Sequence, residues 1–383
     1  MKWTKRKKED SVALFNKRDR VLGIDISASS VKLVELSHGG QRFKVEALAI
    51  EPLPEGIIED RNPSDLDALA DAIKRALKMS GSHLRKVAVA VPTSSVITRI
   101  IPMPAEFGED EIAANIQIDA SQYIPFPLEE IYLDFQVQGA SKASTGSQDV
   151  MLVASRQENV DLRRDVLKDA GLKATVVDVE AYALENTFQL LAQELFKDKG
   201  DKQSPNGKVS LTKQQDENLT ALVDMGAKVT TLYVLRGDRV IFTREQMFGG
   251  EQLTTMIAET YALPKERAEQ AKRSGELPED YPATVLAPFM EFAAEQISQA
   301  LQFYFSSDHY HSSRNSIDSV ILLGGGALVT GLDKAVTNRL DIPTILGNPF
   351  ASMGSAPRVN RRTLLRDAPL FAVACGLALR SFD

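Results

Sequence analysis

Runs of apolar and alternating residues divide the first ninety positions into strands and one helix. Residues 21–25 are an apolar run, and residues 31–36 and 43–50 alternate between apolar and polar side chains, as strands do. Apolar residues at helical spacing predict a helix over residues 65–79. The almost continuous apolar run at 86–91 is typical of a buried central strand. This order indicates an α/β unit.

The next eighty residues predict a compact α+β insert. Strands are expected over residues 97–103, 131–137 and 150–155, and helices over residues 110–123 and 159–170. A buried strand at 176–179 and a helix at 181–196 then resume the first unit. The insert therefore occupies residues 96–175.

The opening pattern returns after a polar segment. Residues 197–218 hold almost no large apolar side chain, which predicts a flexible linker. Residues 219–235 then repeat the order strand, Asp, tight turn, strand, and Asp224 falls in register with Asp25. This weak internal duplication predicts two similarly built lobes.

Composition narrows the class of protein. The 383 residues are 43% hydrophobic and 25% charged with a net charge of −7, which fits a soluble globular protein and argues against a nucleic-acid binder. The single cysteine, Cys375, allows no internal disulfide and fits a reducing cytosol. No signal peptide or membrane-spanning run is expected. Residues 1–19 are basic, and two interpretations stay open: a solvated tail, or a weak contact with lipid or a partner.

Two Asp-bearing hairpins suggest a phosphate clamp. Asp25 and Asp224 each end a strand, where a carboxylate can hold hydrated Mg²⁺. The turns can direct backbone N–H groups at phosphate oxygens, with Gly226 in the second turn. Hydroxyl donors and one cation complete the predicted contacts to phosphate: Ser29, Ser30 and Lys32. One such hairpin alone would be more simply explained as an ordinary turn.

A glycine-rich turn strengthens this interpretation. Gly324, Gly325 and Gly326 follow an apolar strand and precede a helix, so the backbone there can approach a ligand closely. Gly249 and Gly250 form a second turn that opens a helix. Glu269 and Lys272 lie one helical turn apart, which in isolation indicates only a solvated helix face.

In this order, the motifs resemble those of the actin-like ATPases, whose fold is a two-lobed, ribonuclease H-like α/β fold. The resemblance implies that Asp25 and Asp224 lie near Mg²⁺ and that the three glycines at 324–326 pack against the adenosine of ATP. It also implies that Glu269 and Lys272 contact ribose and adenine. Glu180 falls where relatives orient the attacking water, the one catalytic role implied. Many relatives have Gly where this chain has Ser27, so we expect ATP binding with at most slow hydrolysis.

The early insert resembles subdomain 1C of the FtsA and PilM branch, and stretches such as 23–36, 123–126, 248–250 and 301–307 are similar to the PilM family of type IV pilus assembly proteins. The implied boundaries are a basic flexible tail at 1–19, the first part of subdomain 1A at 20–95, the 1C insert at 96–175, the connect-1 part of 1A at 176–196, a flexible linker at 197–218, the second lobe (2A and 2B) at 219–350, and a return to 1A (connect-2) at 351–383.

The resemblance implies a cytoplasmic, ATP-binding scaffold of the pilus machine, peripheral at the inner membrane through its partners and serving pilus biogenesis and twitching motility. The implied partner is the cytoplasmic N-terminal segment of PilN, held in a groove between 1A and 1C. Pilus motor ATPases, other inner-membrane pilus proteins and self-association are further implied contacts. Two alternatives remain: an FtsA-like division filament, disfavoured because the chain stops at Asp383 without an amphipathic helix, and a small-molecule kinase of the same superfold, for which no second-substrate residues are evident.

Overall fold

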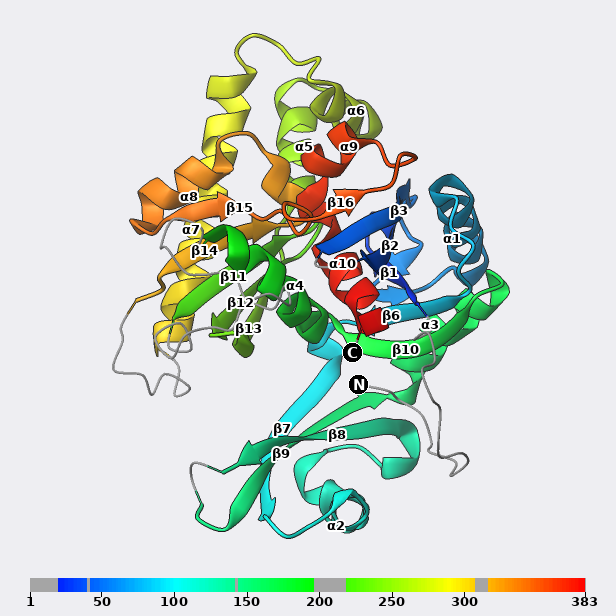
Figure 1. The fold of residues 1–383 in the computed structure, drawn as a ribbon. Helices are drawn as coiled ribbons and strands as arrows, with labels where there is room; N and C mark the ends of the chain where they lie inside the picture. Colours follow the sequence, from blue (N-terminus) through cyan, green and yellow to red (C-terminus); the bar gives the residue numbers. More distant parts are fainter. Residues whose placement is uncertain (1–19, 40–41, 142–143, 196–217, 307–315, 383) are drawn as a thin grey trace.

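The computed structural model describes residues 20–39, 42–141, 144–195, 218–306 and 316–382. The predicted tail at 1–19 and all but the last residue of the predicted linker lie outside the described residues. Two mixed sheets, each covered by helices, lie side by side, and a small three-stranded sheet projects from the first (Figure 1).

The first sheet has the strand order β10-β6-β1-β2-β3-β16. Its strands are β1 (Leu22–Ser27), β2 (Ser30–Gly39), β3 (Arg42–Pro52), β6 (Lys86–Val91), β10 (Lys173–Val179) and β16 (Gly354–Ser355). Helices α1 (Leu66–Ser80) and α3 (Gln157–Asp169) pack on one face, and α4 (Glu180–Leu195) and α10 (Ala372–Leu379) pack on the other. Central strands buried on both faces explain the continuous apolar runs of the sequence.

The second sheet repeats the design with the order β13-β12-β11-β14-β15. Its strands are β11 (Leu219–Met225), β12 (Thr230–Arg236), β13 (Arg239–Gln246), β14 (Ser319–Leu323) and β15 (Thr344–Leu346). β11 pairs antiparallel with β12 and parallel with β14, just as β1 pairs with β2 and β6. The predicted duplication is therefore confirmed, and Asp25 and Asp224 occupy equivalent strand ends.

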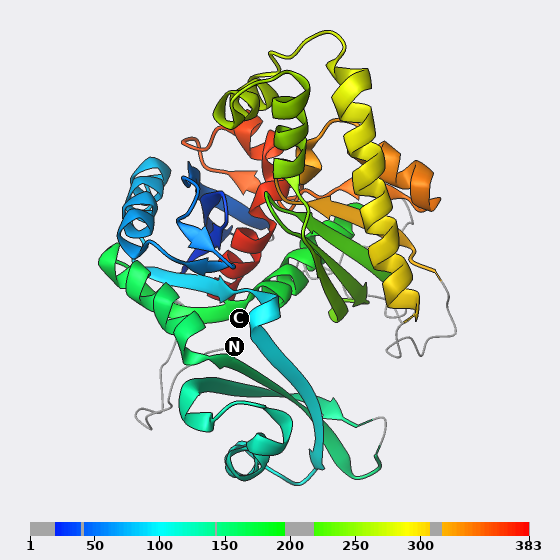
Figure 2. The same cartoon turned by 180° about the vertical axis from the view of Figure 1, so that it is seen from behind.

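Helices cover the second sheet and extend beyond it. They are α5 (Gly250–Thr260), α6 (Lys265–Ser274), α7 (Ala287–Ser306) and α8 (Leu332–Leu340). α7 runs along the outer side of this lobe, as the view from behind shows (Figure 2). Its buried side chains, among them Phe289, Ile297 and Tyr304, belong to the core of the second lobe.

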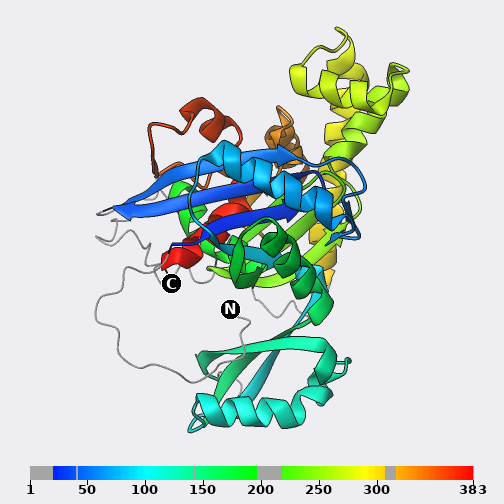
Figure 3. The ribbon, with the colours of Figure 1, turned by 90° about the vertical axis from the view of Figure 1, so that its right-hand side faces the viewer.

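The insert has its own sheet and core. Strands β7 (Val96–Pro104), β9 (Ser147–Arg156) and β8 (Ile131–Ala140) pair in that order. Helix α2 (Glu109–Tyr123) covers the face that is turned away from the first lobe (Figure 3). α3 follows β9 and packs on α1 and β10, so its contacts are with the first sheet as well as with the insert.

Short elements connect the larger ones. The hairpin β4 (Ile58–Glu59) and β5 (Asn62–Pro63) follows β3, and α9 (Arg361–Arg366) precedes α10. Among the described residues, no helix is both long and apolar enough to cross a membrane.

Two glycines let the central elements approach closely. A Cβ on Gly23 of β1 would lie 2.1 Å from the carbonyl oxygen of Ala374, and a Cβ on Gly376 of α10 would lie 1.8 Å from that of Ala183 on α4. Both distances are shorter than any real contact, so α10 can pack between β1 and α4 only with glycine at these positions. This packing joins the helices beneath the candidate site.

Candidate functional site between the lobes

The first Asp-bearing hairpin is held by its own polar side chains. The ammonium of Lys32 donates to Asp25 Oδ2 at 2.9 Å and to Ser27 Oγ at 2.8 Å, and all three residues come from β1 and β2. Ser27 Oγ in turn donates to the carbonyl of Ser30 at 2.9 Å. Ser29 lies in the turn, where its carbonyl accepts from the N–H of Leu53. The predicted residues of this hairpin are therefore brought together, and Ser27 serves to position Lys32.

The second hairpin places Asp224 opposite Asp25. Burial, and after it the negative charge of Asp25, raise the pKa of Asp224 to about 6, against the opposing effects of Lys32 and Arg61. Two carboxylates that repel each other form a site that favours a cation. Within the described ranges no group of three or more His, Cys, Asp or Glu could hold a metal alone. Two carboxylates and several waters are a common protein contribution to bound Mg²⁺, so the pair fits this ion.

The predicted glycines form three turns that pack together. The carbonyl of Gly226 accepts from the N–H of Gly250 at 2.9 Å, and a Cβ on Gly249 would lie 2.5 Å from that same carbonyl oxygen. Gly324 has a φ of 81°, and a Cβ there would lie 2.5 Å from Asp224 Oδ1. A Cβ on Gly326 would lie 2.4 Å from the side chain of Met225. Packing between the turns therefore requires glycine at Gly249, Gly324 and Gly326, and Gly226 is required within its own turn, where a Cβ would lie 2.8 Å from the carbonyl oxygen of Val229.

Gly250 and Gly325 differ from the other four. The nearest atom to a Cβ on Gly250 would be 3.6 Å away, and for Gly325 it would be Leu370 Cδ2 at 3.7 Å. Both are ordinary contact distances, so packing within the protein does not demand glycine at these two positions. Close approach of a ligand to the backbone is a reason that would still demand it.

Glu269 and Lys272 are more than a solvated pair. Lys272 Nζ lies 2.6 Å from Glu269 Oε2 and donates to Thr254 Oγ1 and to the carbonyl of Gly250. Burial alone would raise the pKa of Glu269, but hydrogen bonds from Lys272 and Thr254 lower it to about 2, with help from Arg273. This network ties α6 to the first turn of α5. A hollow of about 620 Å³ lies beside it, lined by Glu266, Glu269, Gln270, Arg273 and Ser274.

Glu180, at the first position of α4, faces a cation that the sequence analysis did not single out. The guanidinium of Arg61 makes a short ion pair with Glu180 and a second, at 2.9 Å, with Glu245 of β13. Burial raises the pKa of Glu180 to about 7, opposed by Arg61 and supported by the charges of Asp25 and Asp224. A carboxyl group with a pKa near neutrality can take up a proton from water at physiological pH.

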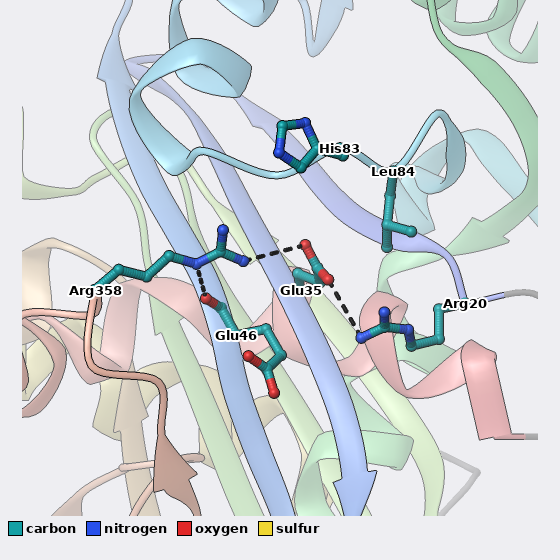
Figure 4. A pocket seen from close by; sticks show the side chains of 6 residues that line it. All are labelled: Arg20, Glu35, Glu46, His83, Leu84 and Arg358. Atoms are coloured by element: carbon teal, nitrogen blue, oxygen red, sulfur yellow. Dashed lines mark hydrogen bonds and ion pairs between the residues drawn. The ribbon is translucent and has the colours of Figure 1, made fainter.

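A separate cavity of about 360 Å³ lies on the first lobe, away from these residues (Figure 4). Glu35 is buried there, accepts a hydrogen bond from Ser82 Oγ at 2.6 Å and is flanked by Arg20 at 3.3 Å and Arg358 at 3.9 Å. Arg358 also donates to the carbonyl of Glu46 at 2.7 Å. These contacts join β2, β3 and the segment before α9, so the cluster has a structural role.

Comparison with known proteins decides the family. The sequence profile of the family described as type IV pilus assembly protein PilM matches residues 23–382. The chain belongs to the PilM family. A chain of the solved PilM-PilN type IV pilus biogenesis complex is 28% identical, with a TM-score of 0.74, covering 96% of this chain and 99% of that one. The expected actin-like fold and the expected family are thereby confirmed.

Two more distant similarities agree with the fold. The cell division protein FtsA of Agrobacterium fabrum is 23% identical over 374 residues, which span 89% of this chain and 80% of that protein. The solved ethanolamine utilization protein EutJ from Carboxydothermus hydrogenoformans is 16% identical, with a TM-score of 0.51, and the similarity covers 94% of this chain and 89% of that one. The PilM family is thus one branch of a wider set of proteins with this fold.

Proposed function

We propose that this PilM-family chain is a scaffold of type IV pilus assembly that binds ATP between its lobes and the N-terminal cytoplasmic segment of PilN beside its insert. The observation that carries the proposal is the similarity, over nearly the whole of both chains, to the PilM-PilN type IV pilus biogenesis complex. The proposed subdomain boundaries are those implied by the sequence.

The proposed nucleotide site uses the residues that the fold brings together. Asp25 and Asp224 would hold hydrated Mg²⁺, and the two facing hairpins would hold the phosphates. The side chains and turns proposed to contact the phosphates are Ser29, Ser30, Lys32, Gly226, Gly249 and Gly250. The glycines at 324–326 would pack on adenosine, and Glu269 and Lys272 would contact ribose and adenine. Packing within the protein does not demand glycine at Gly250 and Gly325, where a Cβ would meet only ordinary contacts, and this supports a close approach of a ligand to the backbone there.

Bound Mg²⁺ would supply charge stabilisation to the phosphates, and this chain's residues would supply positioning. Glu180 is proposed to orient the attacking water. The pKa of Glu180, about 7, supports this role. Its ion pair with Arg61, however, engages the carboxylate that would have to orient the water. We therefore propose that hydrolysis is slow and that the nucleotide acts chiefly as a conformational ligand.

The proposed PilN site lies on the face of the insert sheet opposite α2. Successive side chains of a strand point to opposite faces, so Ile100 lies on this face while the buried Ile101 packs toward α2. Ile100 is 54% exposed. The hydroxyl of Tyr182 on α4 lies 3.1 Å from Thr98 Oγ1, so the same face is linked to the first lobe.

Helix α4 supports the proposed dependence of PilN binding on nucleotide, because it touches all three parts of the molecule. Glu180 lies at the proposed nucleotide site, and Tyr182 contacts Thr98 of the insert. Glu185 accepts a hydrogen bond from the N–H of Val240 in the second lobe at 2.7 Å. A shift of this helix on closure of the lobes would therefore change the face offered to PilN.

Retention of the full chain on an immobilised PilN N-terminal peptide, with and without Mg-ATP, tests the proposal. We expect stronger retention with Mg-ATP, and loss of retention in Ile100→Asp. The matched control is Ile118→Asp, because Ile118 is 77% exposed on α2, on the opposite side of the insert sheet. Equal loss in both variants, or no retention of the wild type in either condition, would refute the partner claim.

Further contacts are proposed only by family resemblance. They are the pilus motor ATPases, self-association, and a position at the inner membrane through PilN. The similarity to FtsA favours one alternative function, an ATP-dependent filament. Sedimentation of the chain with Mg-ATP distinguishes the two, since the scaffold is expected to stay in the supernatant and the filament to pellet.

A further inference from the structure

Arg61 stands in a tight hairpin turn between the lobes. It occupies the turn of the β4–β5 hairpin with Asp60, and the two residues have φ values of 65° and 46°, in the left-handed region that side chains disfavour. Its guanidinium contacts Glu180 at the start of α4 and Glu245 on β13. One side chain thus links the first lobe to the second.

The backbone of this turn is fixed from behind. Arg163 of α3, which is only 2% exposed, donates through Nη2 to the carbonyl of Arg61 at 2.8 Å and through Nη1 to Asn62 Oδ1 at 3.0 Å. Asn62 also donates to Asn159 Oδ1 at 3.1 Å. Because the main chain is held in this way, a change of partners by Arg61 would involve its side chain, which keeps a quarter of its surface exposed.

The charges around the Arg61 guanidinium suit an exchange of partners. Besides Glu180 and Glu245, it interacts electrostatically with Asp224, and Glu180 interacts with Asp25. Lys32, the cation of the first Asp-bearing hairpin, is already held by Asp25 and Ser27. A terminal phosphate placed among these groups would be a stronger acceptor for a forked guanidinium than either single carboxylate.

We propose that Arg61 senses the terminal phosphate of a bound nucleoside triphosphate by exchanging its contacts with Glu180 and Glu245 for contacts with that phosphate. The proposal rests on the proposed nucleotide site. It assigns two consequences to one movement. Glu180 loses its ion pair and becomes free to orient water, and the direct link from the first lobe to Glu245 is replaced by a link through the nucleotide. ATP and ADP would then set different lobe arrangements.

A fixed structural tie is the competing explanation, and it predicts a different pattern. If Arg61 only holds the lobes together through Glu245, its loss weakens the binding of both nucleotides alike, and loss of Glu245 does the same. If Arg61 senses the terminal phosphate, the loss of Arg61 weakens the binding of the triphosphate only. Removal of its competing partner Glu245 then weakens the binding of neither nucleotide.

The test measures the affinity of the full chain for a non-hydrolysable ATP analogue and for ADP, each with Mg²⁺, by calorimetry. For Arg61→Ala we expect affinity for the analogue to fall about tenfold to a hundredfold, as for a lost charge-assisted hydrogen bond, with ADP affinity unchanged. Arg61→Lys should restore part of the loss, because it keeps the charge without the fork. Glu245→Gln should bind the analogue at least as tightly as the wild type.

Unchanged ADP affinity in each variant also shows that the protein is folded. An equal loss for both nucleotides in Arg61→Ala, or a weaker analogue affinity in Glu245→Gln, would overturn the sensor and favour the fixed tie. Wild-type protein that binds neither nucleotide would instead overturn the proposed nucleotide site, and the sensor with it. Wild-type protein that binds both, with Arg61→Ala binding both equally well, would overturn the sensor alone.

Discussion

The partly buried carboxylate of Asp224 gives a sharp test of the site, because its removal should weaken nucleotide binding but raise the stability of the fold. Burial and the charge of Asp25 raise the pKa of Asp224 to about 6, whereas an unfolded chain has an Asp pKa of ~3.9. The ionised carboxylate therefore destabilises the ligand-free fold above pH 6, and the cost disappears as the pH falls through 6 toward 4. Asp224→Asn removes that charge.

The pKa of Asp224 differs by about two units between the folded and the unfolded chain, so its ionised carboxylate costs the fold at most ~3 kcal/mol. We therefore expect Asp224→Asn to raise the free energy of unfolding by about 1–3 kcal/mol at pH 8. The gain should vanish near pH 4, where the wild-type carboxyl group is protonated. Urea unfolding in EDTA, without nucleotide, measures both values. In the same variant, Mg-ATP affinity should fall sharply, because one of the two proposed oxygen ligands loses its charge.

Asp25→Asn is the contrasting variant. Its carboxylate accepts from the buried ammonium of Lys32 at 2.9 Å, so the change should lower stability by a few kcal/mol while it also weakens Mg-ATP binding. A loss of stability at pH 8 in Asp224→Asn, similar to that in Asp25→Asn, would refute the view that Asp224 is held at a cost for the sake of a cation.

Two further predictions concern the packing and pH response of the central helices. Gly376→Ala should lower the free energy of unfolding in urea by about 1–3 kcal/mol, because the clash with the Ala183 carbonyl outweighs the ~1 kcal/mol that alanine gains in a helix. The control is Gly39→Ala, which should be neutral because no atom lies within 4 Å of its Cβ. Equal stability of the two variants would contradict the packing argument. Burial raises the pKa of Glu185 to about 7, against ~4.3 in the unfolded chain. As the pH falls from 8 to 5, the free energy of unfolding of the wild type should therefore rise by up to ~3 kcal/mol more than that of Glu185→Gln. Parallel pH profiles of the two proteins would show that the Glu185 carboxyl group does not titrate in this range.

Much of the fold was readable from local patterns. Helix α1 was predicted at 65–79 and spans Leu66–Ser80, and α2 was predicted at 110–123 and spans Glu109–Tyr123. The repeat of strand, Asp, turn and strand was also readable, because strand alternation and turn residues have short, fixed spacings. The hairpin β4–β5 was not predicted, since its two-residue strands carry no periodic pattern.

The sequence by itself determined the two Asp-bearing hairpins, the glycine turns and the helix with Glu269 and Lys272, because each is a local signal within a few residues. Only the tertiary structure decided what these residues touch. It joined Arg61 to Glu180, 119 residues away, and to Glu245 on the second sheet. It also separated the glycines that packing requires from Gly250 and Gly325. Such pairings depend on how two sheets and their helices pack against each other, and no spacing along the chain records the side chains that then come within a few ångströms.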